Sequence, residues 1–183
     1  MDHEAANRIL ANALEVGPRC GSVILIGIDG RSGAGKTTLA GLISELAHKR
    51  GLRIATIHND ELCPGWDGLP AVPERLGDIA RQLSVSGTAT YPTWDWYANT
   101  EGPEGQLPPS DLVILEGVAS IDPGWAAMRS VSVWVEAPAD IRKDRAIGRD
   151  GDGFAAHWDA WATAEDCYYS ATPPRADVVV EVS

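Results

Sequence analysis

One eight-residue stretch constrains the fold of this 183-residue chain more than any other feature. Residues Gly30–Thr37 read GRSGAGKT and match the pattern G-x-x-x-x-G-K-[ST] at every fixed position. Glycines there let the backbone wrap closely around phosphate oxygens, because a Cβ atom would clash with them. The backbone N–H groups then form an anion nest beside the positive end of the following helix. The sequence therefore predicts a phosphate-binding loop.

The residues around this loop carry the strand and helix signals that the motif requires. Ser22–Asp29 is an almost continuous apolar run, as expected for a parallel strand covered on both faces. Lys36–Arg50 reads as a helix, which Gly51 ends. Strand and helix signals alternate along the rest of the chain, without repeats or linkers. This pattern predicts an α/β fold and a single domain over residues 1–183.

The remaining elements follow from hydrophobic periodicity and from Gly and Pro positions. The other expected helices are Glu4–Val16, Pro73–Val85, Pro138–Arg149 and the aromatic-rich stretch Asp152–Ser170. The other expected strands are Arg53–Ile57, Asp111–Glu116, Val131–Val135 and Asp177–Val182. Two stretches rich in Gly, Pro and Trp, at about 58–72 and 86–110, are expected to be irregular. Such loops often carry function, and here they would lie on the acceptor side of a site.

The loop motif predicts how a nucleotide is held. Lys36 is expected to bridge the β- and γ-phosphates of ATP, and the Thr37 hydroxyl to bind Mg²⁺. The alternative is a glycine-rich turn with an accidental lysine. Asp29, just before the loop, either supports the metal or stabilises the turn. The expected nucleotide contacts are Gly30, Ser32, Gly33, Ala34, Gly35, Lys36, Thr37 and Thr38.

Two further carboxylates are expected at the same crevice, because ligands of open α/β sheets bind beyond the carboxyl ends of the strands. Glu116 ends an apolar strand and is predicted to hold Mg²⁺ directly or through water, the alternative being a solvent-facing glutamate. Asp60 follows another strand and is predicted to accept a hydroxyl proton and to help hold the metal. Glu61 and Asp67 compete for the role of base, whereas His58 is more typical of a structural histidine.

A predicted helix carries three arginines on one face, because they lie at positions i, i+3 and i+7: Arg142, Arg145 and Arg149. Guanidinium groups stabilise the charge on a transferring phosphoryl group, and a mobile segment that carries them excludes water. We therefore predict an arginine lid at about 142–153 in which all three act in catalysis and Arg145 also contacts the nucleotide. The alternative is a solvated face paired with Asp140, Asp144 and Asp150.

The composition limits the partners of the chain. The chain has 15 Lys and Arg residues and 26 Asp and Glu residues, so its net charge is −11. Such a surface repels nucleic-acid backbones and anionic lipid, so duplex nucleic acid and membranes are poor partners. Three widely spaced cysteines without a C-x-x-C favour neither disulfides nor zinc. With no secretory signal and no apolar run of about 18 residues, we expect the chain to stay in the cytoplasm. We expect it to be a monomer or a small homo-oligomer.

The chain resembles the uridine kinase-like branch of the P-loop nucleoside and small-molecule kinases. The residues that carry the resemblance are GRSGAGKT (Gly30–Thr37), Asp60, LVILEG (Leu112–Gly117), the arginine pattern of Asp140–Asp150 and RADVVV (Arg175–Val180). The resemblance implies a three-layer P-loop NTPase fold, in which helices flank a five-stranded parallel sheet with the loop on its central strand. It also implies an arginine lid, a catalytic acid at Asp60, and adenine packed around residues 173–176.

The chain departs from this family on the acceptor side. Uridine kinases carry a tyrosine soon after the catalytic aspartate, where this chain has Leu62-Cys63 followed by PGWDG (Pro64–Gly68). They also carry a Y-D-F segment followed by histidine and arginine. Here the second segment reads YPTWDWY (Tyr91–Tyr97). Trp94 and Trp96 either stack on a base, with Asp95 binding a sugar hydroxyl, or close the core as structural aromatics. Trp66, in the first loop, is the other candidate for the acceptor pocket.

The resemblance implies ATP- and Mg²⁺-dependent transfer of the γ-phosphate to a hydroxyl of a small molecule, most typically a nucleoside or a similar compound. A kinase of the gluconate or shikimate type is the alternative within this class. A nucleotide-dependent ATPase switch is a further alternative. A guanine-reading N/T-K-x-D motif is missing from the sequence, and this argues against a GTP-specific switch.

Overall fold

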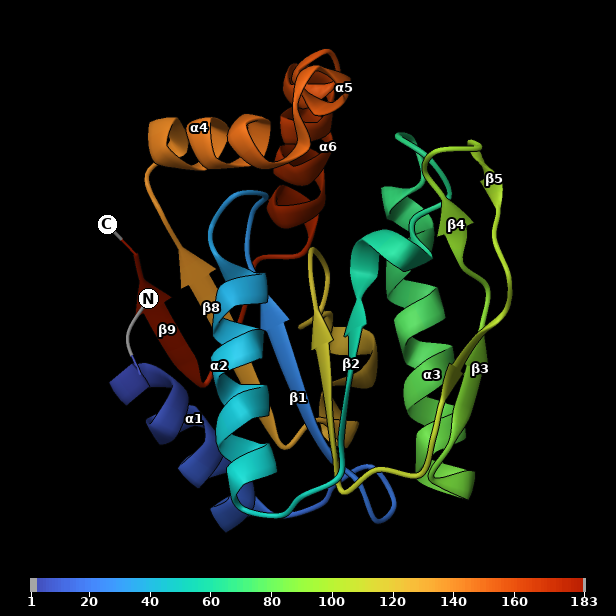
Figure 1. Ribbon diagram of the computed structural model, residues 1–183, viewed down its shortest axis with the longest axis vertical. Helices are drawn as coiled ribbons and strands as arrows, with labels where there is room; N and C mark the ends of the chain where they lie inside the picture. The colour runs from blue at the N-terminus through green and yellow to red at the C-terminus, as the bar shows by residue number, and fades with distance from the viewer. Residues whose placement is uncertain (1–2, 183) are drawn as a thin grey trace.

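The structure is a computed structural model that describes residues 3–182, all except Met1, Asp2 and Ser183. Its centre is a five-stranded sheet in the order β2–β7–β1–β8–β9, with every neighbouring pair parallel (Figure 1). The strands are β1 (Ile24–Asp29), β2 (Ile54–His58), β7 (Leu112–Glu116), β8 (Val131–Glu136) and β9 (Val178–Glu181). All five predicted strands are confirmed, and the loop motif follows the central strand as the resemblance implies.

Alternating side chains of the sheet fill two apolar layers. On β1, Ile24, Ile26 and Ile28 pack with α1 (His3–Val16) and α2 (Lys36–Lys49) on one face. Leu25 points to the opposite face, where it packs with α3 (Val72–Ser86). Because residues on both faces are covered, every residue of β1 and β7 is buried. This explains why these strands are read as continuous apolar runs in the sequence.

The chain between β8 and β9 lies over the carboxyl ends of the strands (Figure 1). It forms α4 (Ala139–Asp150), α5 (Asp152–Ala155) and α6 (Trp158–Ala171). The stretch that we expected to be a single helix from residue 152 is therefore two helices separated by a short turn. Together, the sheet, its two helical layers and this cover confirm the predicted three-layer α/β fold.

Two expectations about irregular segments need correction. Residues 86–110 contain a two-step antiparallel hairpin, in which β3 (Ala89–Tyr91) pairs with β6 (Gly105–Leu107) and β4 (Trp94–Asp95) pairs with β5 (Thr100–Glu101). These strands are too short for a visible alternation pattern, so the sequence did not predict them. Residues 58–72 contain two 3-10 turns, η1 (Asn59–Leu62) and η2 (Leu69–Ala71), and a third, η3 (Pro123–Met128), follows β7.

Within residues 3–182, no helix has both the length and the apolar character that crossing a bilayer would require.

Candidate active site

The register of the sheet determines which side chains meet at its carboxyl edge. Glu116, the last residue of β7, aligns with Ile28 of β1 on one side and with His58 of β2 on the other. Asp60 lies two residues beyond the end of β2, and the glycine-rich loop begins immediately after β1. Because parallel strands end at one edge, three segments far apart in the sequence bring polar groups to one place.

The loop between β1 and α2 has the backbone that its glycines predict. Gly30, Gly33 and Gly35 all have positive φ angles, which residues with a Cβ rarely adopt. A Cβ on Gly33 would also collide with the backbone of Arg142 on α4. Lys36 starts α2 and is buried, and its ammonium group donates hydrogen bonds to the carbonyls of Gly30 (2.8 Å) and Arg31 (3.0 Å). The ammonium group of Lys36 is therefore held at the opening of the loop by the loop's own carbonyls.

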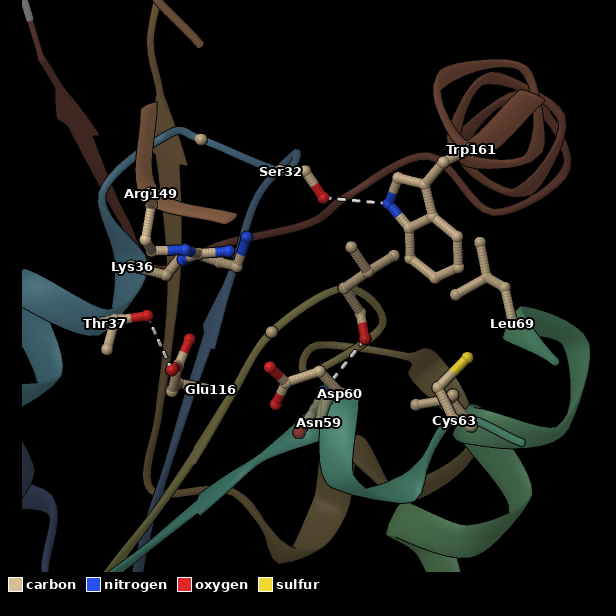
Figure 2. A pocket seen from close by; sticks show the side chains of 14 residues that line it. Ser32, Lys36, Thr37, Asn59, Asp60, Cys63, Leu69, Glu116, Arg149 and Trp161 are labelled. Carbon is tan, nitrogen blue, oxygen red and sulfur yellow. Dashed lines mark hydrogen bonds between the residues drawn. The ribbon is translucent and has the colours of Figure 1, made fainter. Parts of the chain in front are cut away.

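A cavity of about 90 Å³ opens beside this loop (Figure 2). Its lining includes Lys36 and Thr37 from the loop, Glu116 from β7, Asp60 from η1 and Arg149 from α4. The Asp60 carboxylate is exposed and points toward Glu116, Lys36 and Arg149 (Figure 2). The structure thus brings together five of the residues that were singled out in the sequence, and it places opposite charges around one space.

Glu116 is the buried anion of this site, with 4% of its surface exposed. Its Oε1 accepts a hydrogen bond from the Thr37 hydroxyl (2.9 Å) and lies 2.5 Å from His58 Nδ1. Burial alone would raise the pKa of Glu116, but the hydrogen bond with His58, the charge of Lys36 and the Thr37 hydroxyl lower it. The same hydrogen bond raises the pKa of His58. His58 therefore holds the carboxylate in its ionised form.

The Thr37–Glu116 pair has the chemistry of a Mg²⁺ site. A hydroxyl and a carboxylate oxygen lie 2.9 Å apart at the start of the helix that follows the loop. Among residues 3–182, no group of three or more His, Cys, Asp or Glu side chains is arranged to hold a metal ion. A Mg²⁺ ion bound by one or two protein oxygens takes its remaining ligands from water and phosphate. The predicted assignments of Thr37, Glu116 and Asp60 to the metal stay predictions on this basis.

Asp29, the last residue of β1, is a structural anchor for the loop. Its carboxylate is buried and accepts hydrogen bonds from the amides of Gly30 (2.7 Å), Ala119 (3.1 Å) and Ile121 (3.0 Å). The hydroxyl of Tyr169 on α6 donates a fourth, at 2.6 Å. Burial raises the pKa of Asp29 to about 6, although these hydrogen bonds oppose the shift. The carboxylate thus stabilises the turn, one of the two roles that we considered.

Replacing Asp29 with asparagine is expected to destabilise the chain by about 2–4 kcal/mol. The amide keeps one acceptor oxygen, so at least one buried backbone N–H, that of Ile121 when the oxygen stays at the Oδ1 position, loses its partner and faces an NH₂ group instead. Urea unfolding followed by circular dichroism measures the change. Asp78→Asn is the matched control, because Asp78 is exposed and pairs with Arg81 on the same helix. An Asp29→Asn variant as stable as that control would contradict the anchoring role.

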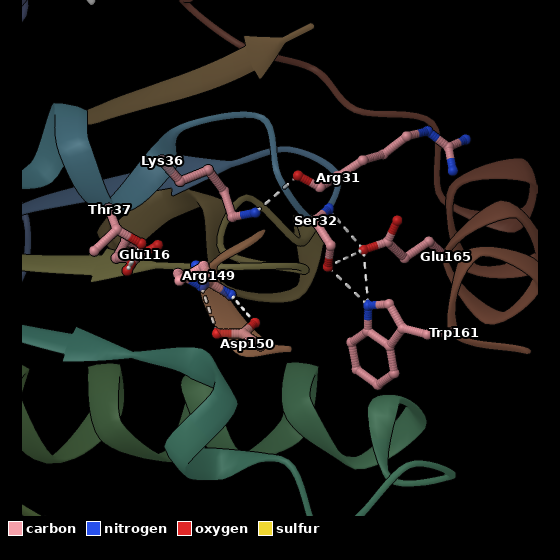
Figure 3. Close-up of polar contacts among 9 residues, drawn as sticks. All are labelled: Arg31, Ser32, Lys36, Thr37, Glu116, Arg149, Asp150, Trp161 and Glu165. Carbon is pink, nitrogen blue, oxygen red and sulfur yellow. Dashed lines mark hydrogen bonds and ion pairs between the residues drawn. The ribbon is translucent and has the colours of Figure 1, made fainter. Parts of the chain in front are cut away.

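The three lid arginines lie in different surroundings. Arg149 lines the cavity and pairs with Asp150 through two hydrogen bonds of 2.6 and 2.7 Å (Figure 3). Arg142 instead contacts the loop itself and donates hydrogen bonds to the carbonyls of Ala137 (3.1 Å) and Ser32 (3.4 Å). Arg145 is exposed and does not line this cavity. Of the three, only Arg149 directly borders the space where a phosphoryl group would move, and the catalytic roles stay predictions.

The tryptophans of the acceptor-side loops do not line this cavity. Trp66 stacks on His157, with ring centroids 4.2 Å apart, and meets the edge of Trp96 at 4.8 Å. Trp96 Nε1 donates a 3.0 Å hydrogen bond to the carbonyl of Asp60. Trp66 also lines a separate cavity of about 530 Å³, which shares Trp161 with the first cavity. Trp66 thus connects the loop at 58–72 to the turn between α5 and α6, and Trp96 connects the hairpin to Asp60.

Trp94 and Asp95 have local roles in the hairpin. Trp94 is partly buried and packs over Gly65. Asp95 Oδ1 accepts hydrogen bonds from the amides of Tyr97 and Ala98, both at 2.9 Å, and so caps the turn between β4 and β5. These contacts correspond to the structural alternative for the WDW triplet. The assignment of Trp66, Trp94, Asp95 and Trp96 to substrate binding stays a prediction.

The sequence analysis missed a set of contacts from α6. Trp161, Glu165 and Tyr169 lie at i, i+4 and i+8, and all three form hydrogen bonds with Asp29 or Ser32. Their helical spacing was visible in the sequence. Which element that face would meet was not, because the contact spans more than 120 residues of chain.

Known proteins similar to this chain include curated uridine kinases, although no model of a protein family matches it. A uridine kinase of Alkaliphilus metalliredigens is 31% identical over 144 residues, which cover 69% of this chain and 68% of that protein. Uridine kinase-like protein 3 of Arabidopsis thaliana is 28% identical over 167 residues, 82% of this chain. This chain spans only 35% of the length of that plant relative.

The fold is also found among solved structures. A structure from Bacillus stearothermophilus, described as a possible uridine kinase, superposes with a TM-score of 0.69 at 23% identity and covers 97% of each chain. The parallel sheet and the glycine-rich loop are consistent with the family that the match to the Alkaliphilus enzyme indicates. The chain belongs to the uridine kinase family of P-loop kinases.

Proposed function

We propose that this chain transfers the γ-phosphoryl group of ATP, with Mg²⁺, to a hydroxyl of a nucleoside or a nucleoside-like small molecule. Membership of the family makes it a kinase of small molecules. One observation carries the finer proposal: a single cavity has the loop cation Lys36 and the Thr37–Glu116 pair on one wall and the Asp60 carboxylate on the other. Transfer to a hydroxyl needs groups that bind the phosphates and the metal on one side and a proton acceptor on the other.

The loop side of the cavity would bind the nucleotide. The backbone amides and Lys36 hold the phosphates, beside the positive end of α2. Thr37 and Glu116 would hold Mg²⁺, which would neutralise charge on the phosphate oxygens. The hydrogen bond from His58 keeps Glu116 ionised for this purpose.

The opposite side would activate the acceptor. Asp60 accepts the proton of the acceptor hydroxyl as the oxygen of that hydroxyl bonds to the γ-phosphorus. The bond from the γ-phosphorus to the bridging oxygen breaks, and ADP leaves with the electron pair. Arg149, at the border of the cavity, stabilises the charge on the transferring group. Asp60 is exposed, so an acceptor that enters from solvent reaches it directly.

The size of the cavity favours a second candidate. At about 90 Å³ it is smaller than the roughly 300–1,000 Å³ typical of ligand pockets. The tryptophans that would stack on a nucleobase lie outside it. A compact polyol or hydroxy acid needs less space beside Asp60 than a nucleoside does. A small-metabolite kinase of the gluconate or shikimate type is therefore the alternative.

A transfer assay with ATP labelled at the γ-position tests both candidates. The acceptor panel contains nucleosides, compact polyols and hydroxy acids, with EDTA and no-acceptor controls. We expect a labelled product that requires Mg²⁺ and one class of acceptor, with ADP formed in equal amount. ATP hydrolysis at the same rate with and without every acceptor would contradict the proposal and favour an ATPase switch.

Trp96→Phe tests how the hairpin supports Asp60. Phenylalanine keeps an aromatic ring beside Trp66 but removes the N–H that bonds to the Asp60 carbonyl. We expect transfer to fall about 3- to 10-fold, because one neutral hydrogen bond contributes about 1 kcal/mol, while Mg·ATP affinity stays the same. Tyr97→Phe is the control, since Tyr97 is fully exposed on the same hairpin. A loss of ATP affinity equal to the loss of transfer would make Trp96 a general structural residue.

A further inference from the structure

One face of α6 lies against the outer side of the phosphate-binding loop (Figure 3). Trp161 and Glu165 are one helical turn apart on this face, and both contact Ser32. Ser32 lies between Gly30 and Gly33, both of which have positive φ angles and no side chain to hold them. Contacts to Ser32 therefore have a large share in fixing the shape of the loop.

Glu165 forms the centre of this contact. It is 1% exposed, and its Oε1 accepts hydrogen bonds from the Ser32 amide (2.8 Å) and the Ser32 hydroxyl (2.7 Å). Trp161 Nε1 lies 2.9 Å from the same carboxylate oxygen and 2.8 Å from the Ser32 hydroxyl. A buried carboxylate is costly unless donors surround it, so these groups hold one another in a fixed geometry.

The contact reaches the site itself. Ser32 and Trp161 both line the cavity beside Lys36, whereas Glu165 is not among the lining residues. The carboxylate thus holds the loop without lining the cavity, and it occupies the Ser32 amide, a group that the sequence predicted as a nucleotide contact. A movement of Glu165 would displace the wall against which the phosphates pack.

We propose that Glu165 is a positioning residue for ATP, which acts through Ser32 and Trp161 to keep the loop in its phosphate-binding shape. The inference rests on the proposed function, because it assumes that this loop binds ATP. Glu165 touches neither the acceptor side of the cavity nor Asp60. Its hydrogen bonds are to Ser32 and Trp161, so we expect its contribution to fall mainly on the nucleotide.

The neighbouring residue provides a matched control. Asp166 also ties α6 to the loop, through a 2.6 Å ion pair with Arg31, but 67% of its side chain is exposed. Exposed ion pairs are screened by water and contribute little. Asp166→Asn therefore removes a contact between the same two segments without disturbing the buried network.

The test compares Glu165→Ala, Glu165→Gln and Asp166→Asn in transfer assays with the best acceptor of the panel. We expect kcat/KM for ATP to fall about 10- to 100-fold in Glu165→Ala, because small displacements of positioning groups have effects of this size. The KM of the acceptor should change less than about twofold. Glu165→Gln keeps an acceptor oxygen and should recover most of the loss. Asp166→Asn should match the wild-type chain.

Two results would overturn the proposal. One is a folded Glu165→Ala variant with unchanged kcat/KM for ATP, and the other is an equal loss toward ATP and acceptor. Should Glu165→Ala fail to fold by circular dichroism, Trp161→Phe replaces it. This change removes the indole N–H donor to Ser32 and Glu165 and also shortens the ring that meets Trp66. Its loss should therefore be larger in the ATP parameter than in the KM of the acceptor. An unchanged ATP parameter in folded Trp161→Phe then counts against the proposal.

Calorimetry with Mg·ATP alone separates this inference from the proposed function. A wild-type chain that binds no ATP would refute the proposed function. If the wild-type chain binds ATP and Glu165→Ala binds it with the same affinity, only the role of Glu165 is refuted.

Discussion

Asp60→Asn is expected to bind Mg·ATP as the wild-type chain does and to transfer phosphate about 10²–10⁴-fold more slowly. Asparagine keeps the size of the side chain and removes the carboxylate that would accept the hydroxyl proton. Calorimetry measures the binding, and the labelled-ATP assay measures the transfer. The separation of the two readouts is the signature of an acceptor-side base.

Glu61→Gln and Asp67→Asn are the controls for this prediction. Both residues compete with Asp60 in the sequence, but neither lines the cavity beside the loop. We expect each variant to keep transfer within about threefold of wild type, as for residues that do not act in proton transfer. Near-normal transfer by Asp60→Asn, together with a large loss in Glu61→Gln, would assign the base to Glu61 instead.

Lys36→Ala is expected to lose both functions of the loop side. Removing the ammonium group takes away the positive charge beside the phosphate-binding loop. ATP affinity should therefore fall, and transfer should fall by at least about 10²-fold. Calorimetry and the transfer assay read the two effects. Lys49→Ala, on the same helix, removes an exposed lysine paired with Glu45 and should behave as wild type.

The Lys36→Ala result also needs a folding check, because Lys36 bonds to the carbonyls of Gly30 and Arg31. A thermal melt within a few degrees of wild type shows that the fold is intact. A folded Lys36→Ala variant with normal transfer would contradict the assignment of this lysine to the phosphates.

The sequence predicts the sheet and one side of the site well, because both follow from local patterns. The burial of β1 on both faces appears directly as an apolar run, and the loop motif has fixed spacing. The convergence of Glu116 and Asp60 with the loop follows from the rule that parallel strands end at one edge. The pairing of Glu116 with His58 does not, because it depends on the register of β7 against β2.

The structure of the acceptor side is the part that the sequence predicts least well. The strands of the hairpin are two or three residues long, which leaves no periodic signal. The WDW triplet left two roles open, and only tertiary contacts show that Trp96 bonds to the Asp60 backbone while Asp95 caps a turn. The face of α6 was visible as helical spacing, but its partner Ser32 lies 129 and 133 residues away from Trp161 and Glu165.

Titration of the wild-type chain with Mg·ATP in a calorimeter tests the phosphate-binding loop most directly. We predict saturable binding of one ATP per chain, a higher melting temperature in its presence, and much weaker binding by Lys36→Ala. No heat of binding and no shift in melting temperature at millimolar Mg·ATP would contradict the assignment of this site to ATP.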